Sequence, residues 1–171
     1  MLVPTPDIIA FIIFIALAFD FTNGFHDSAN SISTVISTKV LSPQKAVVFA
    51  AFFNFIAAFG FGVAVASTIS KIINLGYVDP VIVPYIILAA LLGAIGWNLI
   101  TWYSGLPTSS SHALIGALAG AGISAGGLAA IKMGTIDTVV LFMILSPIIG
   151  FIMAFLFMSC VLWISKGAQR M

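Results

Sequence analysis

Five long apolar segments restrict the folds open to this chain more than any other feature. They cover Ile8–Phe19, which continues into the mixed stretch Asp20–Thr38, then Lys45–Ser70, Val81–Tyr103, Thr108–Ile131 and Thr138–Ile164. A membrane-spanning helix needs about 20 apolar residues, so each segment is long enough to span, the first with part of the polar stretch behind it. The runs are continuous and do not alternate with polar residues, which argues against a membrane barrel.

The composition supports a membrane protein. Of the 171 residues, 61% are hydrophobic and only 6% are charged, whereas soluble domains are about 25% charged. Six Lys and Arg against five Asp leave no basic patch, so nucleic acid is not an expected partner. We predict an all-α integral membrane protein that contacts the lipid bilayer through about five transmembrane helices plus a broken or re-entrant segment. Residues 1–171 are expected to form a single transmembrane domain.

The positive charges predict an orientation. If the first helix runs from outside to inside, four of the six cations face the cytoplasm, namely Lys39, Lys45, Lys166 and Arg170. The positive-inside rule therefore favours an outside N-terminus and a cytoplasmic C-terminus. Because the number of crossings is odd, a second homologous half joined after Arg170 would be inverted, as in inverted-repeat transporters.

The first functional candidate is the polar stretch of residues 20–34. It carries two Asp, two Asn and one His at the end of an apolar segment, and carboxylates at membrane depth usually line a cavity or an ion path. We expect Gly24 to break the helix here. In the helix that follows, four polar residues share one face, namely Asp27, Asn30, Ser31 and Thr34. These oxygens suit a hard cation, although hydroxyls and amides also hold membrane helices together.

The second candidate is residues 104–112, which read Ser-Gly-Leu-Pro-Thr-Ser-Ser-Ser-His. Thr108 or one of the serines is expected to cap the helix that follows. Helix N-termini bind anions such as phosphate through free N–H groups and the positive end of the dipole. The stretch has no Lys or Arg, so a bound anion can also be released. An ordinary capped helix start is the alternative, but a cap needs one hydroxyl and four stand here in a row.

Other residues inside the apolar segments give weaker signals. Asn54, Asn98 and Thr101 either line the same cavity or hold helices together. Gly116 and Gly120 form a G-x-x-x-G pattern, which is typical of close helix packing.

At the two polar stretches the chain resembles the inorganic phosphate transporter family of the Pit type. Many members read G-A-N-D-x-A-N near the first helix, where residues 24–30 read Gly-Phe-His-Asp-Ser-Ala-Asn, a variant similar to the bacterial low-affinity branch. Residues 105–116, Gly-Leu-Pro-Thr-Ser-Ser-Ser-His-Ala-Leu-Ile-Gly, are similar to the family's second signature. The resemblance extends from Ile8 to about Lys166. Family members have two inverted halves, and this chain holds one.

The resemblance implies secondary active transport of inorganic phosphate, alone or as a neutral metal–phosphate complex. A proton or sodium gradient across the bacterial inner membrane would drive it, with no cofactor besides the coupling ion. It further implies that the chain works with a second half or as an antiparallel homodimer.

The matching motifs predict two groups of site residues. The phosphate-binding residues are Thr108, Ser109, Ser110, Asn30 and Ser31. The residues for cation or proton coupling are Asp27, His26, Asp20 and Asn23. Histidine stands where the sodium-coupled signature has asparagine, and imidazole titrates in the physiological range, so we favour proton coupling. No resident metal site and no catalytic residues are predicted.

Three other functions compete with transport. A non-transporting membrane subunit, or an inactive half that needs a partner chain, would have the same composition. A membrane hydrolase would use Ser110 or Ser111 with His26 or His112 as base. However, the chain lacks a G-x-S-x-G elbow, and adjacent helical residues such as Ser111 and His112 point about 100° apart. A cation channel would leave the hydroxyl-rich helix start unexplained.

Overall fold

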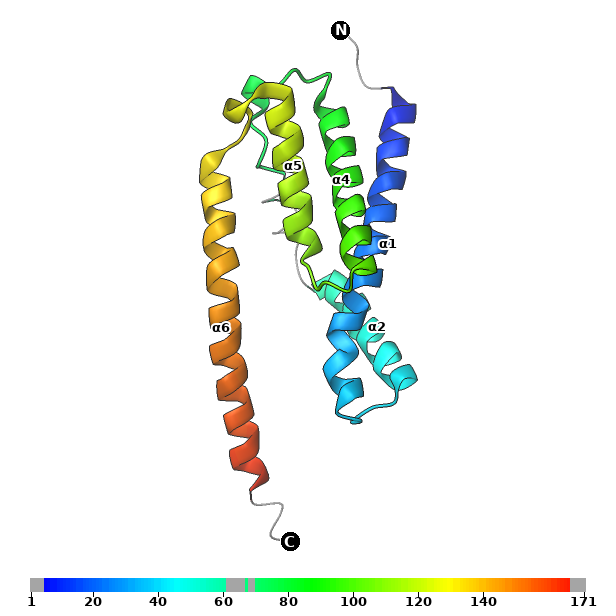
Figure 1. The fold of residues 1–171 in the computed structure, drawn as a ribbon, viewed down its shortest axis with the longest axis vertical. Helices are drawn as coiled ribbons and strands as arrows, with labels where there is room; N and C mark the ends of the chain where they lie inside the picture. Colours follow the sequence, from blue (N-terminus) through cyan, green and yellow to red (C-terminus); the bar gives the residue numbers. More distant parts are fainter. Residues whose placement is uncertain (1–4, 61–66, 68–69, 167–171) are drawn as a thin grey trace. The chain divides into compact units, whose positions relative to one another are not determined.

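The computed structural model describes residues 5–60, 67 and 70–166. This part of the chain is helical, and no β-strand forms within these ranges (Figure 1). The described residues form five α-helices, namely α1 (Pro6–Ser37), α2 (Pro43–Gly60), α4 (Val83–Tyr103), α5 (Ser110–Gly126) and α6 (Met133–Ser165). Two 3-10 turns, η1 (Leu75–Tyr77) and η2 (Leu128–Ala130), lie in the connections. The predicted all-α class and the number of about five helices are confirmed.

Three of the described helices, α1, α4 and α6, are long and apolar enough to cross a membrane. The helix α5 has only 17 residues, or about 25 Å, which is short of a hydrocarbon layer about 30 Å thick. The second apolar segment extends past α2 into residues 61–66 and 68–69, which lie outside the described residues, as does Arg170. The expectation that each segment is long enough to span is thus met by three helices, and α5 is shorter than the predicted segment Thr108–Ile131.

The helix α1 continues without a break through Gly24, which corrects the expected interruption there. A Cβ at Gly24 would meet no atom within 4 Å, and one glycine inside a helix costs only about 1 kcal/mol relative to alanine. The nearby hydroxyls also bond back to the helix, because Thr22 and Ser28 each donate to the carbonyl three residues earlier at 2.9 Å. The polar stretch therefore satisfies itself as helix, and α1 reaches 32 residues.

The helix α4 packs against both α1 and α5 and forms the centre of the first compact unit, Met1–Lys132. The helices α4 and α5 run antiparallel (Figure 1), joined through Gly105, whose φ of +66° favours glycine. The buried apolar face of α4 consists of Ile86, Ala90, Leu91 and Ala94. Phe19 of α1 packs on Leu91 and Ala94, so apolar contacts fix α1 against α4 about one turn before Asn23 and two turns before His26.

Close packing on α5 occurs at Gly122 and Gly126. A Cβ at Gly122 would lie 2.5 Å from Ile73 Cδ1, and one at Gly126 would lie 2.6 Å from a backbone oxygen. The glycines of the predicted packing motif, Gly116 and Gly120, would meet no atom within 4 Å. Glycines of α5 do pack closely, as predicted, but at Gly122 and Gly126 and not at Gly116 and Gly120. The reason is that the contacts depend on which face of the helix is turned toward the neighbouring segment.

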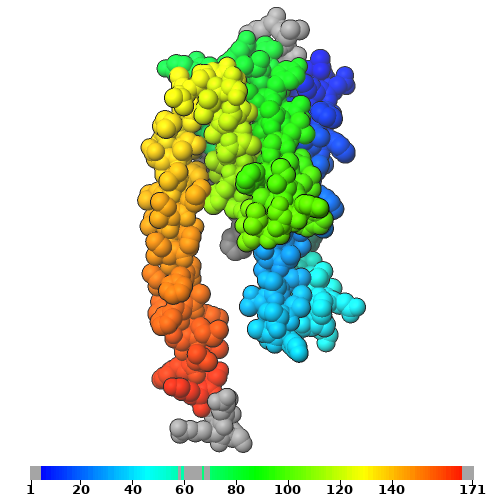
Figure 2. Space-filling model, viewed as in Figure 1, coloured from blue at the N-terminus to red at the C-terminus, as the bar shows by residue number. Residues whose placement is uncertain are grey.

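The second compact unit begins at Met133 and contains α6. Described by itself, α6 is a 33-residue apolar helix with Pro147 in its interior and no buried residue. Figure 2 shows its side chains exposed along the visible face. A helix that is apolar all round is typical of lipid or membrane-protein surroundings. The single transmembrane domain over residues 1–171 stays a prediction.

Candidate functional site

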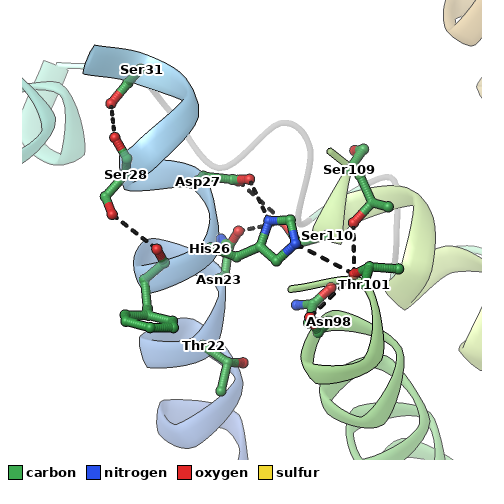
Figure 3. A network of polar contacts seen from close by, with 12 residues as sticks. Thr22, Asn23, His26, Asp27, Ser28, Ser31, Asn98, Thr101, Ser109 and Ser110 are labelled. Atoms are coloured by element: carbon green, nitrogen blue, oxygen red, sulfur yellow. Dashed lines mark hydrogen bonds and ion pairs between the residues drawn. The ribbon is translucent and has the colours of Figure 1, made fainter. Parts of the chain in front are cut away.

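Polar residues in the middle part of α1 contact Ser110, the first residue of α5. Ser110 Oγ donates to Asn23 Oδ1 and lies 3.5 Å from Asp27 Oδ2 (Figure 3). The helix α1 continues past Asp27 to Ser37, so this junction does not lie at its end. If α1 spans the membrane, the turn between α4 and α5 therefore lies at membrane depth. Irregular backbone is tolerated there where it is buried in protein or lines a water-filled cavity.

The His26 side chain on α1 contacts α4 and, through Thr101, is linked to the stretch that precedes α5. Its Nδ1 lies 3.7 Å from Asp27 Oδ1, and its Nε2 lies 3.4 Å from Thr101 Oγ1 on α4. Thr101 Oγ1 in turn lies 3.2 Å from Thr108 Oγ1, just before α5. The His26 side chain is only 6% exposed, whereas that of Asp27 is 49% exposed. A buried imidazole thus joins an accessible carboxylate to the hydroxyls that precede α5.

The hydroxyl-rich stretch forms the beginning of α5. Ser109 is the N-cap residue, with φ −95° and ψ 114°, and its Oγ accepts a hydrogen bond from His112 N at 3.4 Å. The prediction that Thr108 or one of the serines caps this helix is confirmed. Because the first N–H groups of a helix have no partner within the helix, the start of α5 attracts anions.

Two hollows flank the junction. One, of about 670 Å³, lies between α4 and α5 and is lined in part by Thr108, Ser109 and His112. The other, of about 340 Å³, is lined in part by His26, Asn30 and Thr101. Of the predicted site residues, Thr108 and Ser109 border the first hollow and His26 and Asn30 border the second, whereas Asn23, Asp27 and Ser110 line neither.

The structure places some predicted site residues away from the junction. Ser31 lines a hollow between α1 and α2 together with Asn54, and its hydroxyl donates to Ser28 O at 2.9 Å. Asp20 is exposed, and within the described ranges no hydrogen bond or ion pair joins it to the junction. The shared polar face of α1 exists, but its residues border different spaces, because neighbouring helices contact α1 at different heights.

Two residues with weak sequence signals, Asn98 and Thr101, belong to the junction. They are 1% and 2% exposed, and Thr101 links His26 to Thr108. The signal that identifies them is their spacing of three, which puts two polar residues on one face of an otherwise apolar helix.

The junction offers hard oxygen atoms for a small cation and hydroxyl donors for an anion. Asn23 and Asp27 supply an amide oxygen and a carboxylate from α1, and Ser110 supplies a hydroxyl from α5. In the described part of the chain, no group of three or more His, Cys, Asp or Glu residues is placed to hold a metal ion.

Comparison with known proteins gives the family. The chain matches the Phosphate transporter family over residues 23–171. It is 52% identical over 161 residues to a probable low-affinity inorganic phosphate transporter of Bacillus subtilis, covering 92% of this chain and 47% of that protein. A protein of the same description from Rhizobium meliloti is 49% identical over 154 residues, which cover 90% of this chain and 45% of that one. The chain thus spans about half the length of these relatives.

A solved structure described as the sodium-dependent phosphate transporter has the same fold. Its TM-score is 0.79 at 32% identity, and the match covers 84% of this chain and 36% of that one. The relatives are named transporters, which are not enzymes, so the prediction of a non-enzyme is confirmed and the hydrolase is not supported. The family match and the three apolar helices together show that this multi-pass membrane protein belongs to the phosphate transporter family.

Proposed function

We propose that the chain takes part in secondary active transport of inorganic phosphate across the bacterial inner membrane, coupled to protons. The observation that carries this proposal is the contact of Ser110 with Asn23 and Asp27. It joins an anion-attracting helix start to a carboxylate at membrane depth. The names of the relatives, inorganic phosphate transporters, support phosphate as the anion.

Phosphate binds at the start of α5. The hydroxyls of Thr108 and Ser109, with the N–H groups of the first turn, offer hydrogen bonds to its oxygens. The Ser110 hydroxyl, which donates to Asn23 in the structure, turns to the phosphate when the anion binds. Thr108 and Ser109 line the larger hollow, so an anion reaches them. The absence of Lys and Arg from residues 104–112 leaves the binding reversible. Asn30 lines the smaller hollow and approaches the junction from the α1 side.

Asp27 provides the coupling between phosphate and the driving ion. A charged carboxylate beside the Ser110 hydroxyl repels a phosphate anion, so phosphate binds well only when Asp27 is protonated or holds a cation. His26, 3.7 Å away, is the second candidate proton carrier. The oxygens of Asn23 and Asp27 also suit sodium. The uptake experiment below therefore distinguishes sodium from protons as the coupling ion.

A second half completes the transporter. The chain spans about half the length of its relatives, and an inverted second half or an antiparallel second copy would place a matching junction opposite this one. Rocking of the two halves would then open the site to each side in turn. The transported species is phosphate itself or a neutral metal–phosphate complex.

Uptake of radiolabelled phosphate tests the proposal. The chain is expressed in a host without its own phosphate transporters, and the proton and sodium gradients are dissipated separately. We expect uptake that stops when the proton gradient is lost and does not respond to sodium. Sodium-dependent uptake that is insensitive to pH would refute proton coupling. If inserted chain shows no uptake, co-expression with the second half of a relative decides between a missing half and a non-transporting subunit.

Asp27→Asn separates coupling from folding. The amide keeps the size of the side chain but carries no proton and no charge, so coupled uptake should be lost while membrane insertion stays normal. Asp7→Asn, in the first turn of α1, is the matched control and should transport like the wild type. Uptake at the wild-type level in Asp27→Asn would remove Asp27 from the mechanism.

A further inference from the structure

The side chain of Asn98 is an amide that the fold buries without pairing. It is 1% exposed, and within the described residues neither Oδ1 nor Nδ2 has a hydrogen-bond partner. Its backbone oxygen is already used, because it accepts a hydrogen bond from Thr101 Oγ1 at 3.1 Å. Buried side-chain polar atoms are normally hydrogen-bonded, since leaving them unpaired costs free energy. The free energy lost by leaving the amide unpaired would be recovered if a bound ligand supplied the hydrogen-bond partner.

Packing alone gives no reason for an amide at this position. The other buried residues on this stretch of α4 are apolar up to Thr101, namely Ile86, Ala90, Leu91 and Ala94. Leucine has the same number and branching of side-chain heavy atoms as asparagine and carries no polar atom to desolvate. On stability grounds, an apolar side chain suits position 98 better than an amide.

The amide lies beside the proposed phosphate site. Thr101, three residues further along α4, contacts both His26 and Thr108. Figure 3 shows the Asn98 side chain directed from α4 toward α1, below the His26 ring. The free N–H groups at the start of α5 and a buried, unpartnered amide are thus two independent features at one place.

We propose that Asn98 is a further phosphate-binding residue, whose Nδ2 donates to a phosphate oxygen. This inference rests on the proposed binding of phosphate at the start of α5. The α1 side of the junction offers mainly acceptors, Asn23 Oδ1 and the Asp27 carboxylate, and Ser110 already gives its hydrogen to Asn23. An amide NH₂ adds two donor hydrogens without a permanent charge. It strengthens the binding of the anion without preventing its release.

Asn98→Leu is the first test. We expect it to keep or raise the thermal midpoint without phosphate and to lower the affinity for phosphate. The full chain is purified in detergent, and its thermal unfolding is measured with and without inorganic phosphate. Without phosphate, we expect the midpoint of Asn98→Leu to lie at or above that of the wild type, because an unpaired amide is gone. Phosphate affinity, read from the ligand-dependent shift, should fall about tenfold or more, the loss expected for one hydrogen bond. Asn54→Leu, the same replacement in the α1–α2 hollow, should keep wild-type affinity.

Asn98→Asp distinguishes the donor from the acceptor. The carboxylate keeps the Oδ1 position but loses the NH₂ hydrogens, so phosphate affinity should fall at least as far as in Asn98→Leu. Wild-type or stronger phosphate binding in Asn98→Asp would instead assign the oxygen to a cation and overturn the inference. This variant also serves if Asn98→Leu does not fold.

The outcomes separate this inference from the proposed function. Unchanged phosphate affinity in Asn98→Leu, in a chain whose wild type binds phosphate, overturns the inference alone. A clear drop in the midpoint of both Asn98→Leu and Asn98→Asp without phosphate, with phosphate affinity unchanged, also overturns it, because the amide would then be structural. A wild-type chain that gains no stability from phosphate refutes phosphate binding at this junction and the inference with it.

Discussion

The α4–α5 hairpin and α6 are both apolar, but they differ in what they bury. The mean hydropathy of the most apolar 18-residue stretch is 1.9 in α4 and 2.7 in α6, and both helices are candidate membrane spans. The hairpin buries Asn98, Thr101 and Ser110, whereas no residue of α6 is buried. Hydropathy therefore identifies which segments enter the membrane, and buried polar side chains identify which of them builds a site.

The largest difference between the two regions is expected at their glycines. In Gly122→Leu, the Cβ of the new side chain would already lie 2.5 Å from Ile73 Cδ1 and 3.0 Å from Ile131 Cδ1. Overpacking of this kind costs about 1–3 kcal/mol or more, so the thermal midpoint and the yield of folded protein should fall. Gly150→Leu in α6 meets no atom within 4 Å of its Cβ and should cause little change. Equal losses in both variants, measured by thermal unfolding, would contradict the difference in packing.

A smaller but more specific contrast is expected at two serines. Ser110→Ala removes the donor to Asn23 Oδ1 and a predicted phosphate contact. Phosphate uptake should fall about tenfold or more, because a half-buried acceptor loses its partner and a predicted phosphate contact is lost with it. Ser146→Ala, in exposed α6, should transport within about twofold of the wild type, as is usual for exposed positions. A wild-type rate for Ser110→Ala would separate the start of α5 from transport.

The smallest effect is expected at Pro147, in the interior of α6. Proline removes one backbone donor, and membrane helices tolerate this. Pro147→Leu restores a regular helix, so the thermal midpoint should stay equal or rise slightly, and uptake should stay within about twofold of the wild type. A large loss of uptake with normal folding would show that the shape of α6 matters to the site, and the contrast with the hairpin would have to be abandoned.

The helical segments were predictable because bilayer thickness sets their length. The predicted segment Val81–Tyr103 became α4, Val83–Tyr103, and Thr138–Ile164 lies within α6, Met133–Ser165. The expected break at Gly24 failed for a local reason. Hydroxyl groups that bond back to the helix and the small cost of one glycine keep α1 continuous.

The sequence by itself determined the membrane class, the family resemblance and the two polar stretches that hold the candidate site. Only the tertiary structure decided which of these residues meet. Asn23, His26 and Asp27 contact the hairpin, whereas Ser31 borders α2. Periodicity places residues on a face of one helix but carries no information about the height at which a neighbouring helix begins. That height is set by Phe19 packing on Leu91 and Ala94 and by the chain reversal at Gly105.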